Sequence, residues 1–125
     1  DKPVEVIVRS HIELDLGELR ATRVAFVSRA GENQSRQMPP IIANLREGEH
    51  FLDQNAPKSS WTFTGSKGLS VTQRFDDELL DFAWVYAYPE DLGALDVELW
   101  AKPLILPPGE QFTFAHSLEI RESSR

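Results

Sequence analysis

Apolar and polar residues alternate with a period of two along most of this 125-residue chain. In segment 95–101, for example, Leu95, Val97 and Leu99 occupy every second position. Successive side chains of a β-strand point to opposite faces, so this period is typical of a strand that buries one face. The alternation therefore limits the chain to folds built from β-strands.

The same pattern predicts strands in several further segments, separated by turns rich in Gly, Pro and Asp. The predicted strands lie within 4–16, 21–29, 61–63, 69–75, 80–88, 95–101 and 112–120. Segment 30–40 is polar and ends in two prolines, which predicts a loop, and 46–60 is expected to be irregular. Segment 41–45 fits either a short strand or one helical turn. Short, regularly spaced strands favour a sandwich or a barrel, and we predict an all-β fold in which residues 1–125 form a single antiparallel β-sandwich of about eight strands.

The composition excludes several classes of function. The net charge of −7 disfavours binding to nucleic acids and anionic membranes, because both present negative surfaces. No apolar run approaches the ~20 residues of a membrane span. Cysteine is absent, which excludes disulfides, thiolate metal sites and cysteine nucleophiles. We expect a soluble domain that is secreted, periplasmic or part of a longer chain, since the sequence begins at Asp1 rather than Met.

Aromatic residues on strands suggest a carbohydrate-binding function, because sugars stack on exposed rings. Trp84 is in phase with Phe82 and Tyr86, and Trp61 is in phase with Phe63, so both tryptophans are expected in the core. Trp100 is out of phase with its apolar neighbours and is expected to point to the opposite face. Trp100 is therefore the first candidate for ligand binding, although a second sheet packed on that face would bury it.

Three histidines offer further candidates, but none has a metal-binding spacing. His116 lies on an apolar face, where a hydrogen-bonded core histidine is expected. His50 and Asp53 belong to a carboxylate-rich loop that could bind a ligand or supply an acid–base pair, with a solvated acidic loop as the alternative. They form the second candidate site.

The acidic turn 75–81 is a candidate calcium site, because Ca²⁺ binds several carboxylate oxygens. Its candidate ligands are Asp76, Asp77 and Glu78. The spacing is not that of an EF-hand loop, and charged turns also keep the ends of hairpins hydrated. No other cofactor is expected. The sequence contains neither a GxSxG serine motif nor a glycine-rich phosphate loop, and no catalytic residue is assigned.

The last half of the chain resembles the closing strands of galactose mutarotase-like (aldose-epimerase-like) β-sandwich domains. The resemblance runs from "WTFTGSKGLSVTQRF" to "VELWAKPLILPPGEQFTFAHSLEI", where an "ELW" strand precedes an "L-x-PGE-x-F" turn and a final strand. The family's catalytic histidine and carboxylate motifs are not recognisable. The resemblance therefore implies a sugar-associated domain without chemistry of its own.

These observations together predict a non-catalytic domain that binds a carbohydrate or supports a carbohydrate-active protein. A protein-interaction or structural domain is the first alternative, and it would use an apolar patch or a free edge strand to bind a partner protein. A small mutarotase-like enzyme is the second, and it would need a histidine and a carboxylate that converge.

Overall fold

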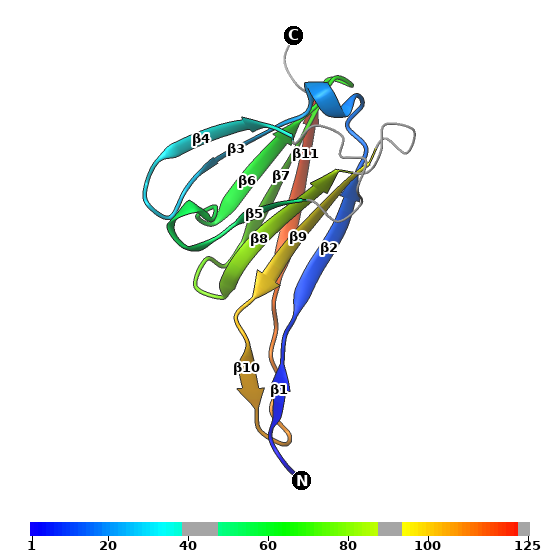
Figure 1. The fold of residues 1–125 in the computed structure, drawn as a ribbon. Helices are drawn as coiled ribbons and strands as arrows, with labels where there is room; N and C mark the ends of the chain where they lie inside the picture. Colours follow the sequence, from blue (N-terminus) through cyan, green and yellow to red (C-terminus); the bar gives the residue numbers. More distant parts are fainter. Residues whose placement is uncertain (39–47, 88–93, 123–125) are drawn as a thin grey trace.

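A computed structural model describes residues 1–38, 48–87 and 94–122. Within these ranges the chain forms antiparallel β-strands and two short 3-10 helices (Figure 1). The N-terminal half contains β1 (Val4–Val6), β2 (Arg9–Leu14), η1 (Leu19–Ala21), β3 (Arg23–Val27), β4 (Asn33–Gln37), β5 (Glu49–Phe51), η2 (Asp53–Asn55) and β6 (Ser60–Thr64). The C-terminal half contains β7 (Leu69–Phe75), β8 (Leu80–Ala87), β9 (Leu95–Ala101), β10 (Leu104–Leu106) and β11 (His116–Glu122).

Most strands belong to two sheets that face each other across the core. The five-stranded sheet has the order β11-β7-β6-β3-β4, and the four-stranded sheet has the order β2-β9-β8-β5. The remaining strands, β1 and β10, pair with each other as a narrow arm that extends from the body and carries the N-terminus (Figure 1). The prediction of an all-β fold is confirmed. No helix in the described ranges is long and apolar enough to cross a membrane.

The core lies between the two sheets and is built from the apolar side of each alternating strand. Trp61 on β6 is 1% exposed and makes edge-to-face contacts with Phe51 and Phe63. Its Nε1 donates to Oε1 of Gln73 at 2.8 Å, and Nε2 of Gln73 lies 3.1 Å from Nδ1 of His116. Because the indole only donates, the amide oxygen faces Trp61 and the amide nitrogen donates to His116. His116 is thus hydrogen-bonded, as expected, although it is only half-buried.

The strands number eleven within the described ranges, more than the predicted eight or so. The predicted strand 4–16 is two strands, of which β1 pairs with β10 and β2 pairs with β9. The loop prediction for 30–40 was wrong at 33–37, where β4 is a polar edge strand whose side chains need no apolar alternation. Segment 46–60 contains β5. Segments 41–45 and 89–93 and Tyr88 lie outside the described residues.

The two sides of the sandwich, where the sheets have their edge strands, differ. On the β4–β5 side, Arg36 forms an ion pair with Glu49, and its guanidinium lies 5.4 Å from the ring centre of Phe51. On the β2–β11 side, Leu118 and Ile120 point to the inner face of their sheet but are 44% and 66% exposed. One side is therefore covered by a charged side chain, whereas the other leaves apolar surface uncovered.

Candidate functional site

The alternation that builds the core also sends a second set of side chains to the outer face of the four-stranded sheet. On β8 and β9, Val85 and Val97 are paired and fully buried, so their chain neighbours point away from the core. We call this surface the outer aromatic face. Its residues are Arg9, His11 and Glu13 from β2, His50 from β5, Phe82, Trp84 and Tyr86 from β8, and Asp96, Glu98 and Trp100 from β9.

The strand register arranges this face in three rows that run across the sheet, about 7 Å apart. Row one contains His50, Trp84, Glu98 and His11. Row two contains Phe82, Trp100 and Arg9. Row three contains Tyr86, Asp96 and Glu13. Aromatic rings thus occupy the β8 side of every row, and ionisable side chains occupy the β2 side.

Row one begins with two stacked rings. The imidazole of His50 and the indole of Trp84 are nearly parallel, at 5°, with their centres 5.1 Å apart. Gly48 lies against the same indole, because a Cβ added there would come within 2.0 Å of Nε1 of Trp84. Trp84 is half-buried, and His50 is exposed. The stack therefore ends at an exposed imidazole on the edge strand β5.

Row two is a stack of three groups from three adjacent strands. The rings of Phe82 and Trp100 are 5.3 Å apart and inclined by 15°. On the β2 side, the guanidinium of Arg9 lies 5.2 Å from the centre of the Trp100 ring, within cation–π range. Nη1 of Arg9 also donates to Oε1 of Glu98 at 2.9 Å. Arg9 therefore covers one face of Trp100 and neutralises the neighbouring carboxylate.

Two carboxylates are buried in the centre of the outer aromatic face. Glu98 is 2% exposed and Asp96 is 7% exposed. Burial raises the pKa of Asp96, and the charge of Glu98 raises it further, while His11 acts in the opposite direction. Nε2 of His11 lies 2.7 Å from Oδ1 of Asp96, but the contact lacks hydrogen-bond geometry. Buried carboxylates attract positive charge and hydrogen-bond donors, because they are removed from water.

Several buried polar atoms on this face lack a hydrogen-bond partner. They are Nε1 of Trp84, Nε1 of Trp100 and Oδ1 of Asp96. Leaving a buried donor or acceptor unpaired costs about 1–3 kcal/mol, so such atoms mark positions where a fold accepts lower stability. All three belong to the same face and are neighbours of Glu98. Trp84 is its cross-strand partner, and Asp96 and Trp100 are two residues before and after it on β9. This concentration makes the outer aromatic face the candidate site.

The structure gives each predicted binding residue a definite place. Trp100 points away from the core, as predicted from its phase, and His50 lies on the same face. Asp53 is exposed in η2, beyond the end of β5, so it does not belong to the three rows. Trp84 was expected in the core but lies on the outer face with Phe82, because the buried alternate set of β8 is Ala83, Val85 and Ala87.

Arg9, His11, Asp96 and Glu98 were not predicted as site residues, although the sequence contains a signal for two of them. Asp96 and Glu98 occupy the same alternate positions as Trp100 on one strand. The prediction that Trp100 points outward therefore also places both carboxylates on the outer face. Arg9 and His11 come from a strand distant in sequence, and only the register of β2 with β9 brings them to the site.

The candidate calcium ligands lie in the turn between β7 and β8. Oδ1 of Asp76 accepts a hydrogen bond from the backbone N–H of Glu78 at 3.0 Å. Oδ1 of Asp77 accepts one from Nε of Arg29 at 3.1 Å, and Arg29 also donates to the carbonyls of Asp77 and Leu80. Two of the three carboxylates thus organise the turn. Among the described residues, no group of three or more His, Asp or Glu is placed to hold a metal ion.

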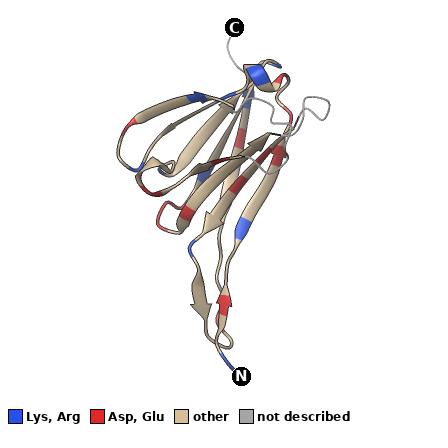
Figure 2. Ribbon diagram, viewed as in Figure 1, with Lys and Arg blue, Asp and Glu red and all other residues tan. Residues whose placement is uncertain are grey.

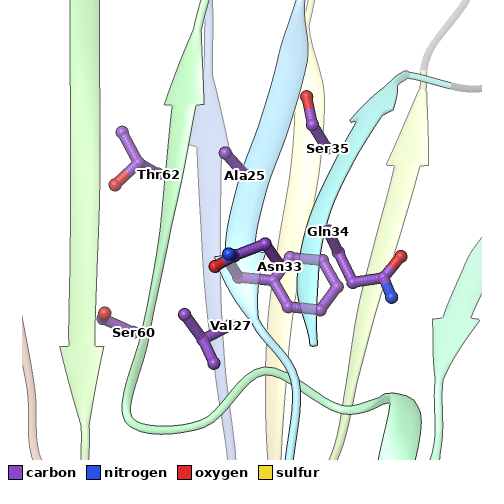
Figure 3. A pocket seen from close by; sticks show the side chains of 8 residues that line it. Ala25, Val27, Asn33, Gln34, Ser35, Ser60 and Thr62 are labelled. Atoms are coloured by element: carbon purple, nitrogen blue, oxygen red, sulfur yellow. The ribbon is translucent and has the colours of Figure 1, made fainter. Parts of the chain in front are cut away.

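The outer face of the five-stranded sheet has a different character. Small polar side chains dominate it, and we call it the outer hydroxyl face: Ser35, Ser60, Thr62, Thr64, Ser70, Thr72 and Ser117, with Arg23, Arg74, Glu119 and Arg121. A shallow hollow opens on this face between β3, β4 and β6, and Ala25, Asn33, Ser35 and Thr62 are among its lining residues (Figure 3). Among the described residues that line this hollow, none is a tryptophan or a buried carboxylate.

The chain matches no protein family model, no curated protein and no solved structure. The site must therefore be interpreted from its own residues.

Proposed function

We propose that this chain is a non-catalytic carbohydrate-binding domain and that its ligand binds on the outer aromatic face. The observation that carries the proposal is the concentration of large rings on a sheet face that does not contribute to the core. Phe82, Trp84 and Trp100 are only half-buried, although residues of this size dominate the interior of other domains. A contiguous apolar patch of rings with polar groups at its centre is typical of a binding surface.

The arrangement suits a sugar for two physical reasons. A sugar ring offers an apolar C–H surface that contacts aromatic side chains, and it offers hydroxyl groups that donate to carboxylates. The rings of rows one and two provide the first kind of contact, and Glu98 and Asp96 provide acceptors between them. The rows repeat about every 7 Å along the strands, so an extended glycan would contact more than one row. The resemblance of the last half of the chain to mutarotase-like domains remains a prediction that points to the same ligand class.

A glycan array, screened with and without Ca²⁺, tests this proposal. Each hit is measured again on Trp84→Ala and on Thr72→Val, a matched control on the outer hydroxyl face. We expect saturable binding that Trp84→Ala weakens at least about tenfold and that Thr72→Val preserves. Dependence on Ca²⁺ would extend the site to Asp76, Asp77 and Glu78. A folded sample that binds no glycan would contradict the proposal.

A second candidate function, self-association, is favoured by the uncovered side of the sandwich. Of the strands in the described ranges, β11 pairs only with β7, so its other backbone edge is available for another strand. If two copies of β11 pair antiparallel about Ile120, the two Ile120 side chains meet and each Glu119 lies opposite an Arg121 of the other copy. Opposite charges across a strand pair are stabilising, so a second copy of this chain is the occupant that fits this edge.

Sedimentation velocity at increasing concentration tests this second candidate. We expect wild type to form dimers, and we expect Ile120→Lys to remain monomeric because it places two like charges opposite each other. Ile105→Lys is the control, because Ile105 is 62% exposed on the β1–β10 arm, away from β11. A wild-type monomer at high concentration, or equal dimerisation of both variants, would contradict it.

A further inference from the structure

The outer aromatic face already holds a positive charge of its own, and this feature points to the chemistry of the ligand. Arg9 is bound between Trp100 and Glu98, with its guanidinium 5.2 Å from the ring centre and Nη1 2.9 Å from Oε1. A cation that is stacked on an indole and paired with a carboxylate occupies the kind of site that binds organic cations in proteins. Arg9 thus shows what this position recognises.

The partners of this contact differ in how firmly they are held. The side chain of Glu98 is 3% exposed, whereas that of Arg9 is 50% exposed. Arg9 reaches the site from the edge strand β2 on a flexible stem, so it can swing into solvent while Glu98 stays fixed in the sheet. Removal of Arg9 alone would leave the buried carboxylate of Glu98 without its positive partner, which is unfavourable. An exchange in which another cation takes the place of Arg9 avoids that cost.

The charge balance of the face favours an incoming cation further. Three carboxylates lie in rows one and three, those of Glu13, Asp96 and Glu98, while Arg9 is the only Lys or Arg in the three rows. Oδ1 of Asp96 forms no hydrogen bond, and its contact on this face is Nε2 of His11 at 2.7 Å. Burial raises the pKa of Asp96 most, and the negative charge of Glu98 raises it further. A ligand that carries its own positive charge can take the place of Arg9 beside Glu98 and balance that charge, whereas the hydroxyl groups of a neutral sugar supply hydrogen bonds but no compensating charge.

We infer that the ligand of the outer aromatic face is a cationic carbohydrate, an amino sugar whose ammonium group displaces Arg9 from Glu98 and from the ring of Trp100. The inference rests on the proposed function, because it assigns the class of sugar that this same face binds. Arg9 then acts as a built-in competitor that keeps Glu98 paired while the site is empty. The exchange requires no movement of β9.

Calorimetric titrations with three ligands test this inference, at a mildly acidic pH at which sugar amines are protonated. The ligands are a glucosamine oligomer, the N-acetylglucosamine oligomer of the same length, and a lysine peptide of equal charge. We expect wild type to bind the glucosamine oligomer at least about tenfold more tightly than either of the others. Equal affinity for the two oligomers would overturn the inference while leaving the proposed function in place. Equal affinity for the lysine peptide would also overturn it, because the face would then select charge rather than sugar.

Two variants on the face and one control assign the effect to the Arg9–Glu98 pair. In Glu98→Gln we expect the two oligomers to bind with affinities within about threefold of each other, because the amine loses its carboxylate. In Arg9→Ala we expect the affinity for the glucosamine oligomer to rise at least about threefold, because the competitor is gone. Thr72→Val should keep the wild-type preference. A preference that survives in Glu98→Gln, or an affinity that falls in Arg9→Ala, would contradict displacement. Failure of both oligomers to bind wild type would overturn the inference, and only a glycan array without hits would contradict the proposed function as well.

Discussion

The two outer faces of the sandwich are built by the same alternation but carry opposite kinds of side chain. The outer hydroxyl face is lined by Ser and Thr, and its charged groups include three arginines against Glu119. The outer aromatic face is lined by rings and buried carboxylates, and Figure 2 shows acidic residues on the strands of its sheet. The backbone is a regular antiparallel sheet in both cases, so only the side chains differ.

The difference teaches which residues the fold itself requires. Small polar side chains suffice on a solvent-side sheet face, as hydroxyl contacts such as the 2.8 Å Thr62–Thr72 pair demonstrate. Rings and buried carboxylates on the opposite face exceed what folding needs, and the unpaired atoms there lower stability. This excess is the reason for proposing that a ligand binds on the outer aromatic face.

Replacement of Trp84 by alanine should give the largest change in stability among single substitutions on the two faces. The substitution removes a half-buried ring that stacks on His50 and lies against Gly48. We expect the free energy of unfolding to fall by about 1–3 kcal/mol, less than for a fully buried tryptophan. Urea denaturation followed by circular dichroism measures the change. A loss within the error of wild type would mean that the rings contribute nothing to the sheet.

Replacement of Arg9 by alanine should have a somewhat smaller effect. Glu98, 2% exposed, would lose the positive partner that the structure shows for it. We expect a loss of about 1–2 kcal/mol, since the half-exposed Arg9 is partly screened by water. Adding Glu98→Gln to Arg9→Ala should restore part of the loss, because the unpaired charge is then removed. An additive double variant would contradict the coupling of the two residues.

The pH dependence of stability sharpens the comparison, because Asp96 has no counterpart on the outer hydroxyl face. Its carboxyl is surrounded by Glu98, Glu13, His11, Arg9 and Tyr86, and its pKa is raised above the ordinary value of 3.8. In the range above 3.8 the folded chain holds this proton more tightly than the unfolded chain, so ionisation of Asp96 lowers stability as the pH rises.

Asp96→Asn should therefore stabilise the fold, because the substituted side chain cannot ionise. We expect the variant to be more stable than wild type at neutral pH and to lose less stability as the pH rises from 3.8 towards neutrality. Thermal unfolding at a series of pH values measures this difference. A variant that is less stable than wild type at neutral pH would show that the ionised carboxylate is favourable where it lies.

Substitutions on the outer hydroxyl face should give the smallest effects. Thr62→Val together with Thr72→Val removes a facing hydroxyl pair but keeps side-chain shape and strand propensity. We expect the free energy of unfolding to stay within about 0.5 kcal/mol of wild type and ligand binding to stay unchanged. A loss of ligand binding in this double variant would indicate that the ligand binds on the outer hydroxyl face, which contradicts the proposed site.

Much of the fold could be predicted because the alternation reports which strands have one buried face. The phase of Trp100 against Val97 and Leu99 correctly predicted its direction, since side-chain direction along a regular strand is a local property. The phase of Trp84 did not, because both alternating sets of β8 are apolar and the period alone does not tell which set is buried. The bulge before Phe82 also separates Leu80, which is buried, from the later residues of its apparent phase. The polar strand β4 escaped prediction for a related reason: an edge strand need not alternate.

The candidate site could be predicted only in part. Trp100 and His50 were singled out as individual residues, but their common face follows from the pairing of β5, β8 and β9. The contact of Arg9 with Glu98 joins residues 89 positions apart. No local pattern contains that information, because strand register in a sandwich is set by the whole core.

The most direct test of the binding site is a map of the backbone amide shifts of the labelled protein during titration with a glucosamine oligomer. The shifts should be largest on β2, β8 and β9, centred on Arg9, Glu98 and Trp100, and small on β3, β6 and β7. Shifts centred on the outer hydroxyl face would contradict the assignment of the outer aromatic face as the binding site. The absence of saturable shifts from a folded sample would contradict an amino sugar as its ligand.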